Sequence, residues 1–258
     1  MLRTHYNKIN DLTIFDILRM HAIFESHYAN SPISTFMDDL GKKDGVFLVR
    51  KKSTDEIVGF SSLGIYEFMH GGKKVKGLFS GDTIIEKAYW GSRSLQNAFA
   101  LKLFIEALKS PFSKQYWLLI SKGYKTYLLL TKNFPTCYPR RGEESSPLKG
   151  LVVEYCDAMF PGKLDHQAMV LDFGHDANCL KGDVAEIDQA LRNKEPDVAF
   201  FEQRNPDWRR GTELPCIAQA DLWTFLKIVG PFLWKSAFKP AKTKQAAPAH
   251  NEREITVR

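Results

Sequence analysis

The chain has 258 residues, and its 44% hydrophobic and 12% aromatic content predicts a packed core and argues against a disordered chain. Lysine and arginine outnumber aspartate and glutamate by 36 to 30, a mild surplus that suits an acidic partner without identifying one. The four cysteines have neither the spacing of a zinc motif nor that of a disulfide framework, and the N-terminus lacks the apolar core of a signal peptide. We therefore expect a cytoplasmic protein without a membrane-spanning segment.

The first 45 residues are predicted to form two helices. Apolar residues recur at helical spacing over 12–29, immediately after Asp11, which we expect to cap that helix. Ser31 and Pro32 are typical of a helix start and precede the second predicted helix, over 33–40.

Three strand patterns follow the two helices. The runs 46–51 and 57–66 flank a short polar turn, which predicts a hairpin. The run 75–90 predicts a third strand, and the small residues Ser80 and Gly81 within it indicate a β-bulge or a local splaying of the strand.

A long helix and a buried strand come next. The helix that follows Gly91 is polar on only one narrow stripe over 95–108, so we expect other elements to cover it on more than one side. The short apolar run 116–120 is typical of a buried strand, and 124–134 predicts a helix that Pro135 ends.

The second half has less regular patterns. We expect a helix over 148–160 and strands over 168–173 and 198–203. Between those strands, Asp183 and Glu186 have the spacing of a capping box at the start of a helix.

Together these elements predict an α+β fold, with a mixed, mostly antiparallel sheet flanked by helices and followed by a C-terminal extension. We expect a core over 1–140, further strands and helices over 141–240 that complete the same sheet and cover the core, and a disordered tail over 241–258. The stretch 221–240 alternates aromatic residues with lysines. It suits either the missing cover of the helix 95–108 or a peripheral contact with a membrane surface.

The order of elements between Asp11 and Arg140 resembles that of the GCN5-related N-acetyltransferase (GNAT) superfamily. Members of that superfamily have two helices, a three-stranded meander, a pyrophosphate-binding loop that opens a helix, a splayed fifth strand and a fourth helix. The resemblance implies an acyltransferase-like fold and a thioester co-substrate, either acyl-CoA or an acyl carrier protein.

The family's loop usually reads Gln/Arg-x-x-Gly-x-Gly/Ala, and here a serine stands where the central glycine is expected. Free N–H groups at a helix start favour a phosphate, and an arginine there adds a bidentate contact. The residues expected to bind the cofactor are Gly91, Ser92, Arg93, Ser94, Leu95 and Gln96, with Ser121 after the buried strand. The alternative is an ordinary strand-to-helix turn with a serine cap.

Transfer of an acyl group to an amine needs a base for the ammonium and donors for the oxyanion. Asp82 and Glu86 are four residues apart on the predicted strand, and Glu86 is the preferred base because it lies in an apolar stretch near the loop. The family's tyrosine acid would fall at Leu129, two residues from Tyr127, so we expect either that Tyr127 serves as the acid or that it only packs. The histidines form no metal-binding pattern, and no metal is expected.

The sequence thus predicts an acyltransferase that moves an acyl group from acyl-CoA or acyl carrier protein to a small-molecule or lipid-like amine by direct attack. The abundant phenylalanines suggest a bulky acyl group or acceptor. The alternative is a non-catalytic module on the same fold that binds an acyl group or a membrane surface. Nucleic acid is not an expected partner, because the charge surplus is small.

Overall fold

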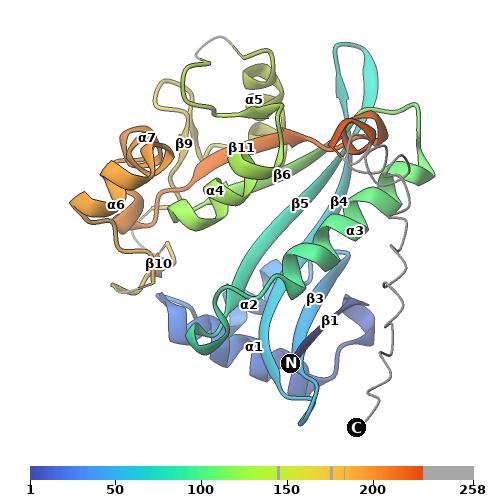
Figure 1. Cartoon of the computed structure of the whole chain (residues 1–258), viewed down its shortest axis with the longest axis vertical. Coiled ribbons are helices and arrows are strands. Elements are labelled where there is room, and N and C mark those ends of the chain that lie inside the picture. The colour runs from blue at the N-terminus through green and yellow to red at the C-terminus, as the bar shows by residue number, and fades with distance from the viewer. Residues whose placement is uncertain (144–145, 175–176, 183, 229–258) are drawn as a thin grey trace, which may run out of the picture.

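The computed structural model describes residues 1–143, 146–174, 177–182 and 184–228 (Figure 1). Its centre is a seven-stranded sheet of order β1-β3-β4-β5-β6-β11-β7. The strands are β1 (Leu2–Lys8), β3 (Gly45–Lys51), β4 (Ile57–His70), β5 (Lys73–Ile85), β6 (Gln115–Ser121), β11 (Leu214–Gln219) and β7 (Cys137–Tyr138).

All neighbours in this sheet are antiparallel except β5 and β6. The parallel pairing begins at Lys76 and Gln115 and ends at Ser80 and Leu119. Strand β5 continues five residues further, to Ile85, without pairing to β6. The two strands therefore separate at this end, which confirms the predicted mixed, mostly antiparallel sheet and places an opening within it.

Helices cover both faces of the sheet (Figure 1). Helices α1 (Ile14–His27) and α2 (Ile33–Leu40) pack against every second residue of β3 on one face of the sheet. The intervening residues of β3 point to the other face, where they pack in one cluster with α3 (Ser94–Lys109) and α4 (Tyr124–Asn133). The same alternation on β5 turns Leu78 toward α3 and Phe79 toward α5 (Leu148–Met159). Side chains on the two faces thus belong to separate cores, as the two-residue period of a strand requires.

The predicted bulge in β5 is confirmed. Pairing with β4 shifts register between Ser61 and Leu63, so that Gly81 and Asp82 together lie opposite Ser62. A β-carbon on Gly81 would lie 2.3 Å from the Ser62 hydroxyl oxygen, so only glycine fits there without displacing its neighbours.

Two short antiparallel ladders involve residues of the second half of the chain. Strand β10 (Cys179–Leu180) pairs with β2 (Tyr28–Ala29), the short strand that follows α1. Strands β8 (Leu164–Asp165) and β9 (Val170–Leu171) form a second small ladder, which replaces the longer strand expected over 168–173. The segment around β10 therefore lies beside the open end of the β5–β6 pair.

The strand predicted over 198–203 is wrong. These residues lie in helix α7 (Pro196–Arg204), which follows α6 (Gln189–Lys194). Pro196 occupies the first helical position, and the buried residues Val198 and Phe201 are three apart, which is a helical spacing.

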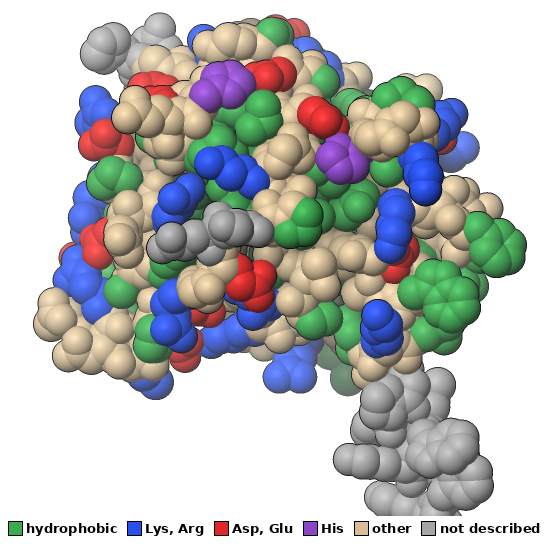
Figure 2. All heavy atoms as spheres, turned by 90° about the horizontal axis from the view of Figure 1, so that it is seen from above, with side chains coloured by type: hydrophobic (Ala, Val, Ile, Leu, Met, Phe, Trp, Pro, Cys, Tyr) green, Lys and Arg blue, Asp and Glu red, His purple; other side chains and the backbone are tan. Residues whose placement is uncertain are grey.

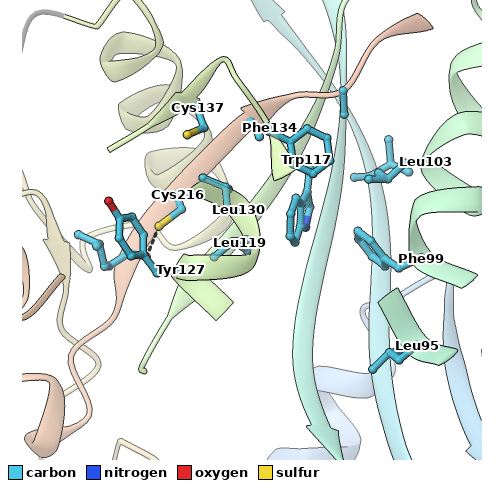
Figure 3. Packing of buried hydrophobic residues seen from close by; sticks show 14 of the residues in the cluster. Leu95, Phe99, Leu103, Trp117, Leu119, Tyr127, Leu130, Phe134, Cys137 and Cys216 are labelled. Carbon is cyan, nitrogen blue, oxygen red and sulfur yellow. Dashed lines mark hydrogen bonds between the residues drawn. The ribbon is translucent and has the colours of Figure 1, made fainter. Parts of the chain in front are cut away.

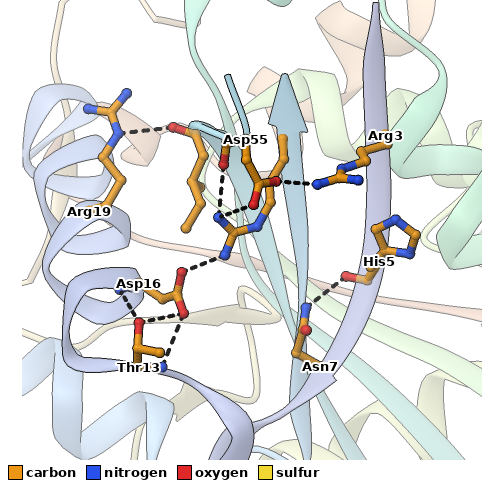
Figure 4. A network of polar contacts seen from close by, with 9 residues as sticks. Arg3, His5, Asn7, Thr13, Asp16, Arg19 and Asp55 are labelled. Atoms are coloured by element: carbon orange, nitrogen blue, oxygen red, sulfur yellow. Dashed lines mark hydrogen bonds and ion pairs between the residues drawn. The ribbon is translucent and has the colours of Figure 1, made fainter. Parts of the chain in front are cut away.

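The starts of three helices also differ from expectation. Thr13, not Asp11, caps α1, through a capping box with Asp16 (Figure 4). Ser31 does not cap α2, because its hydroxyl donates to the Tyr28 carbonyl. The cap of α6 is Asp188; Asp183 of the predicted capping box is outside the described residues.

Sequence patterns did not reveal β1 or β11. Strand β1 forms the edge of the sheet, and its side chains alternate between exposed and half-buried over most of its length, which is a weak signal. Strand β11 is central but contains Pro215, a residue that argues against a central strand.

The end of the described chain lies against α3. Residues 222–228 are helical, and Phe225 contacts Phe104 of α3 at a ring-centroid distance of 5.6 Å in an edge-on geometry. This contact is part of the cover that was expected for the helix 95–108. The rest of the stretch 221–240 and the predicted disordered tail 241–258 lie outside the described residues.

Charges of both signs are intermingled over the face shown in Figure 2, without a patch of one sign. Within the described ranges, no helix has the length and apolar character needed to span a bilayer.

Candidate active site

A cleft of about 520 Å³ occupies the opening between β5 and β6. Its walls come from the α1–α2 region, the β5 bulge, the loop after β6, the start of α4 and the β10 segment. Six aromatic side chains line it: Phe24, Tyr28, Phe36, Phe79, Phe160 and Phe173. Polar groups from the β5 bulge and from the loop after β6 line the same cleft as these aromatic side chains.

Asp82 is a carboxylate in the wall of the cleft. The bulge at Gly81 places it there, and it is only partly exposed to solvent. Burial raises the pKa of Asp82 to about 7, and the negative charge of Asp39 raises it further, against the opposing effect of Lys122 and Lys43. A carboxyl with this pKa changes protonation state near neutral pH, as a general base must.

Two buried or half-buried ion pairs accompany Asp82. The Lys122 ammonium, immediately after β6, donates to the Glu213 carboxylate, just before β11. Lys43 contacts Asp39 at 2.6 Å. Burial raises the pKa of Glu213, and the Lys122 ammonium lowers it.

The turn before α3 exposes backbone amides. Gly91 has φ of +88°, in the left-handed region that favours glycine. The amide of Ser92 donates to the Tyr89 carbonyl at 3.2 Å, and that of Ser94 to the Ser92 hydroxyl at 3.3 Å.

Other backbone amides at the start of α3 have no hydrogen-bond acceptor among the described residues. Arg93 is the N-cap of α3 without a capping side chain, and within the described chain no acceptor engages the amides of Arg93, Leu95 or Gln96. A helix start with unengaged N–H groups is suited to an anion such as a phosphate. Two of the six predicted loop residues, Ser92 and Ser94, thus have internally bonded amides, whereas the other four, including Gly91, have amides without an acceptor among the described residues.

Trp90 and Lys125 lie between this turn and the cleft. The Trp90 indole N–H donates to the Ile85 carbonyl at 2.8 Å. The Lys125 ammonium lies 3.4 Å from the centre of the Trp90 ring and donates to the Val184 carbonyl at 2.6 Å. One lysine on α4 therefore connects the turn before α3 with the segment after β10.

The structure separates the two carboxylates proposed as bases. Glu86 follows the end of β5 and does not line the cleft; its carboxylate accepts from the Arg19 guanidinium at 2.5 Å. Arg19 also donates to the Ile57 carbonyl, on the side of the sheet drawn in Figure 4. Of the two carboxylates predicted as bases, Asp82 lines the cleft and Glu86 does not.

The hydroxyls of Tyr127 and Ser121 both donate hydrogen bonds to backbone carbonyls of the protein. Tyr127 is fully buried in the core shown in Figure 3, where its hydroxyl donates to the Pro139 carbonyl at 3.2 Å. The Ser121 hydroxyl donates to the Gly123 carbonyl at 2.8 Å. Neither residue is among those that line the cleft.

Sequence reasoning missed Asp39, Lys122 and Glu213. Lys122 had a usable signal, since it is a polar residue directly after a buried strand. Glu213 had none, because β11 itself was not predicted. Over the described residues, no group of three or more histidine, cysteine, aspartate or glutamate side chains could hold a metal ion.

Neither a protein-family model nor a curated protein matches this sequence. Solved structures do match part of the chain. A GNAT family N-acetyltransferase from Escherichia coli, in complex with CoA, is 8% identical over 54% of this chain and 77% of its own, with a TM-score of 0.36. A ribosomal-protein-alanine N-acetyltransferase from Brucella melitensis is 12% identical over 51% of this chain and 90% of its own, with a TM-score of 0.38.

A third match is a conserved protein of unknown function from Enterococcus faecalis V583. It is 11% identical over 50% of this chain, with a TM-score of 0.38, and this chain spans only 31% of its length.

Proposed function

We propose that this protein is an acyltransferase that moves an acyl group from a thioester donor to an amine. The observation that carries the proposal is the position of Asp82 in the wall of the opening where β5 and β6 cease to pair. The pKa of Asp82 is about 7 there. A base of that pKa matches the deprotonation of an ammonium group at neutral pH.

In the proposed reaction, Asp82 takes a proton from the acceptor ammonium. The nitrogen lone pair then forms a bond to the thioester carbonyl carbon. As the tetrahedral intermediate collapses, the carbon–sulfur bond breaks and the second proton of the nitrogen passes to the departing sulfur, which gives an amide and a free thiol. Backbone N–H groups at the facing edges of β5 and β6, beyond Ser80 and Leu119, would donate to the oxyanion. A thiolate leaves readily because a thiol pKa is about 8.5, so no acid from the protein is required.

The donor is proposed to enter from the turn before α3. The available amides of Arg93, Leu95 and Gln96, with the positive end of the α3 dipole, would receive its phosphate. Both acyl-CoA and acyl carrier protein carry a phosphate at the far end of the thioester arm, and the proposal includes both as donors. Aromatic side chains around the cleft would hold an apolar acyl or acceptor group.

The test is to incubate the full chain with panels of acyl-CoA and acyl carrier protein donors and primary amines, and to follow the release of free thiol. We expect turnover that falls by about 100-fold or more in D82N. Donor binding without turnover by the wild-type protein would favour the non-catalytic alternative. If the protein showed no binding and no turnover with any donor, an acyl donor would be excluded.

A further inference from the structure

The six aromatic side chains that line the cleft belong to one face of the central sheet. Three of them lie in or against the core of α1 and α2: Phe24, Tyr28 and Phe36. The other three lie in or against the core under α5: Phe79, Phe160 and Phe173. None of the six belongs to the core that α3 and α4 form on the opposite face. The aromatic surround of the cleft is therefore built on the side of the sheet away from α3.

This placement associates the aromatic surround with the acceptor and not with the donor. The proposed function brings the donor's phosphate to the start of α3, so the thioester arm approaches from the face that α3 covers. The charged groups around Asp82 lie on the other face: the Lys43 ammonium, whose charge lowers the pKa of Asp82, lies 5.6 Å from the centre of the Phe79 ring. The amine that Asp82 deprotonates therefore approaches along the aromatic side chains.

Phe79, Phe160 and Phe173 form a row of rings in the wall of the cleft. The ring centroids of Phe79 and Phe160 are 5.8 Å apart, and those of Phe160 and Phe173 are 5.6 Å apart with perpendicular rings. Phe79 is buried, whereas Phe160 and Phe173 are half-buried and leave apolar surface open in the cleft. A ligand that covers this surface removes it from water, and an aromatic ligand gains ring-to-ring contacts in addition.

Tyr28 brings aromatic surface close to the proposed base. Its ring stacks on that of Phe24 at a centroid distance of 4.7 Å. Burial raises the pKa of the Tyr28 hydroxyl, and the negative charges of Asp82 and Glu213 raise it further. Asp82 is therefore close enough for its charge to act on Tyr28, so the carboxylate and the aromatic side chains bound one continuous space.

We propose that the acceptor is a primary monoamine with an aromatic ring on a short alkyl chain, whose ring packs against Phe160 and Phe173 while Asp82 receives its ammonium group. The proposal rests on the proposed function, which makes Asp82 the base. A carboxylate binds the ammonium end of such an amine, and the rings of the cleft bind its aromatic end. The cleft volume of about 520 Å³ is within the range of small-molecule sites, about 300–1,000 Å³.

The first test compares 2-phenylethylamine with 2-cyclohexylethylamine as acceptors for the full-length wild-type protein, with the acyl donor that gives the highest turnover. The two amines have the same number of carbon atoms and differ in the aromaticity of the ring. Aromatic pairs contribute about 2- to 12-fold in binding beyond the area that they bury, so we expect kcat/KM to favour 2-phenylethylamine by that factor. Equal values, or a higher value for the saturated amine, overturn the proposal.

The second test measures the same ratio of kcat/KM values in F160L and F173L, which keep an apolar side chain and remove the ring. We expect the ratio to fall toward one in both variants. Because the ratio compares two amines on one preparation, a smaller folded fraction does not alter it. Phe112 is 93% exposed and does not line the cleft, so F112L is the matched control and should keep the wild-type ratio.

Two outcomes of the second test contradict the proposal. An unchanged ratio in both F160L and F173L overturns it. A higher KM for the acyl donor together with an unchanged ratio also overturns it, because the two rings would then contact the acyl group and not the acceptor.

A binding measurement separates this proposal from the proposed function. Calorimetry with 2-phenylethylamine and the full-length protein needs neither donor nor turnover. Turnover of both amines without an aromatic preference retains the acyltransferase and removes the aromatic acceptor. Binding of 2-phenylethylamine that F160L and F173L weaken, in a protein that transfers no acyl group, retains the cleft as an amine site and removes the enzyme.

Discussion

Gly81 lies so close to Ser62 that a β-carbon on Gly81 would be 2.3 Å from the Ser62 hydroxyl oxygen. This close approach lies at the bulge that places Asp82 in the cleft. We expect G81A to cost about 1–3 kcal/mol of unfolding free energy, as overpacking in a tight interior does. Urea unfolding measures the loss, and S62A should recover part of it in the double variant because it removes the clashing oxygen. Full stability of G81A alone would show that the bulge tolerates a side chain.

Asp82 is the residue whose replacement should separate catalysis from stability. In D82N we expect acyl transfer to fall by about 100- to 10,000-fold, the usual contribution of a general base. The wild-type rate should rise with pH through an apparent pKa near 7, and D82N should lack that dependence. Steady-state rates between pH 5.5 and 8.5 measure both.

The same raised pKa affects folding. Between the unfolded pKa of about 3.9 and the folded value of about 7, the native state binds more protons than the unfolded chain, so this group makes the protein less stable as pH rises. D82N removes that slope and should be at least as stable as the wild type at pH 8. Lower stability of D82N at pH 8 would indicate that the carboxylate is structurally required.

Lys122 and Glu213 should shift the rate profile in opposite directions. Lys122 lowers the pKa of Asp82 and Glu213 raises it, so K122M should move the profile to higher pH and E213Q to lower pH. The other charged group that faces Asp82 from α2, Asp39 with its partner Lys43, is unchanged in both variants. Movement of both profiles in the same direction would mean that packing, not charge, sets the pKa of Asp82.

Local patterns were sufficient to predict most elements of the first half of the fold, but not the strands β1 and β2. The bulge at Gly81, the buried strand β6 and the helices α3 and α4 each have a signal within a few residues of sequence. The sequence named Asp82 only as one of two carboxylates on the predicted strand, and it preferred the other, Glu86.

The remaining parts of the site depend on contacts between distant segments. Glu213 precedes β11, which pairs with β6 more than ninety positions earlier in the chain, and β10 pairs with β2 from a similarly distant part of the sequence. The preference for Glu86 rested on its apolar neighbours in sequence, and these did not reveal the Arg19 guanidinium that the fold brings to it.

Glu86 offers a direct comparison with Asp82. Its ion pair with Arg19 is partly exposed, so E86Q should cost about 0.2–1 kcal/mol in urea unfolding. Because Glu86 does not line the cleft, we expect E86Q to keep wild-type turnover and its pH dependence. A loss of turnover in E86Q as large as in D82N would make Glu86 the base, as its sequence context first suggested.

Tyr127 distinguishes a packing role from an acid role. Its ring lies against Phe200 and Phe201, burial raises the pKa of its hydroxyl, and that hydroxyl donates to the Pro139 carbonyl. Y127F keeps the ring and removes one buried hydrogen bond, so we expect a loss of about 0.5–1.5 kcal/mol in unfolding free energy with kcat unchanged. Chemical denaturation and single-turnover kinetics on the same preparation measure the two effects. A reduced rate of thiol release with unaltered stability would instead assign Tyr127 the role of proton donor to the leaving thiolate, because only a group that reaches the sulfur can slow that step without affecting the core.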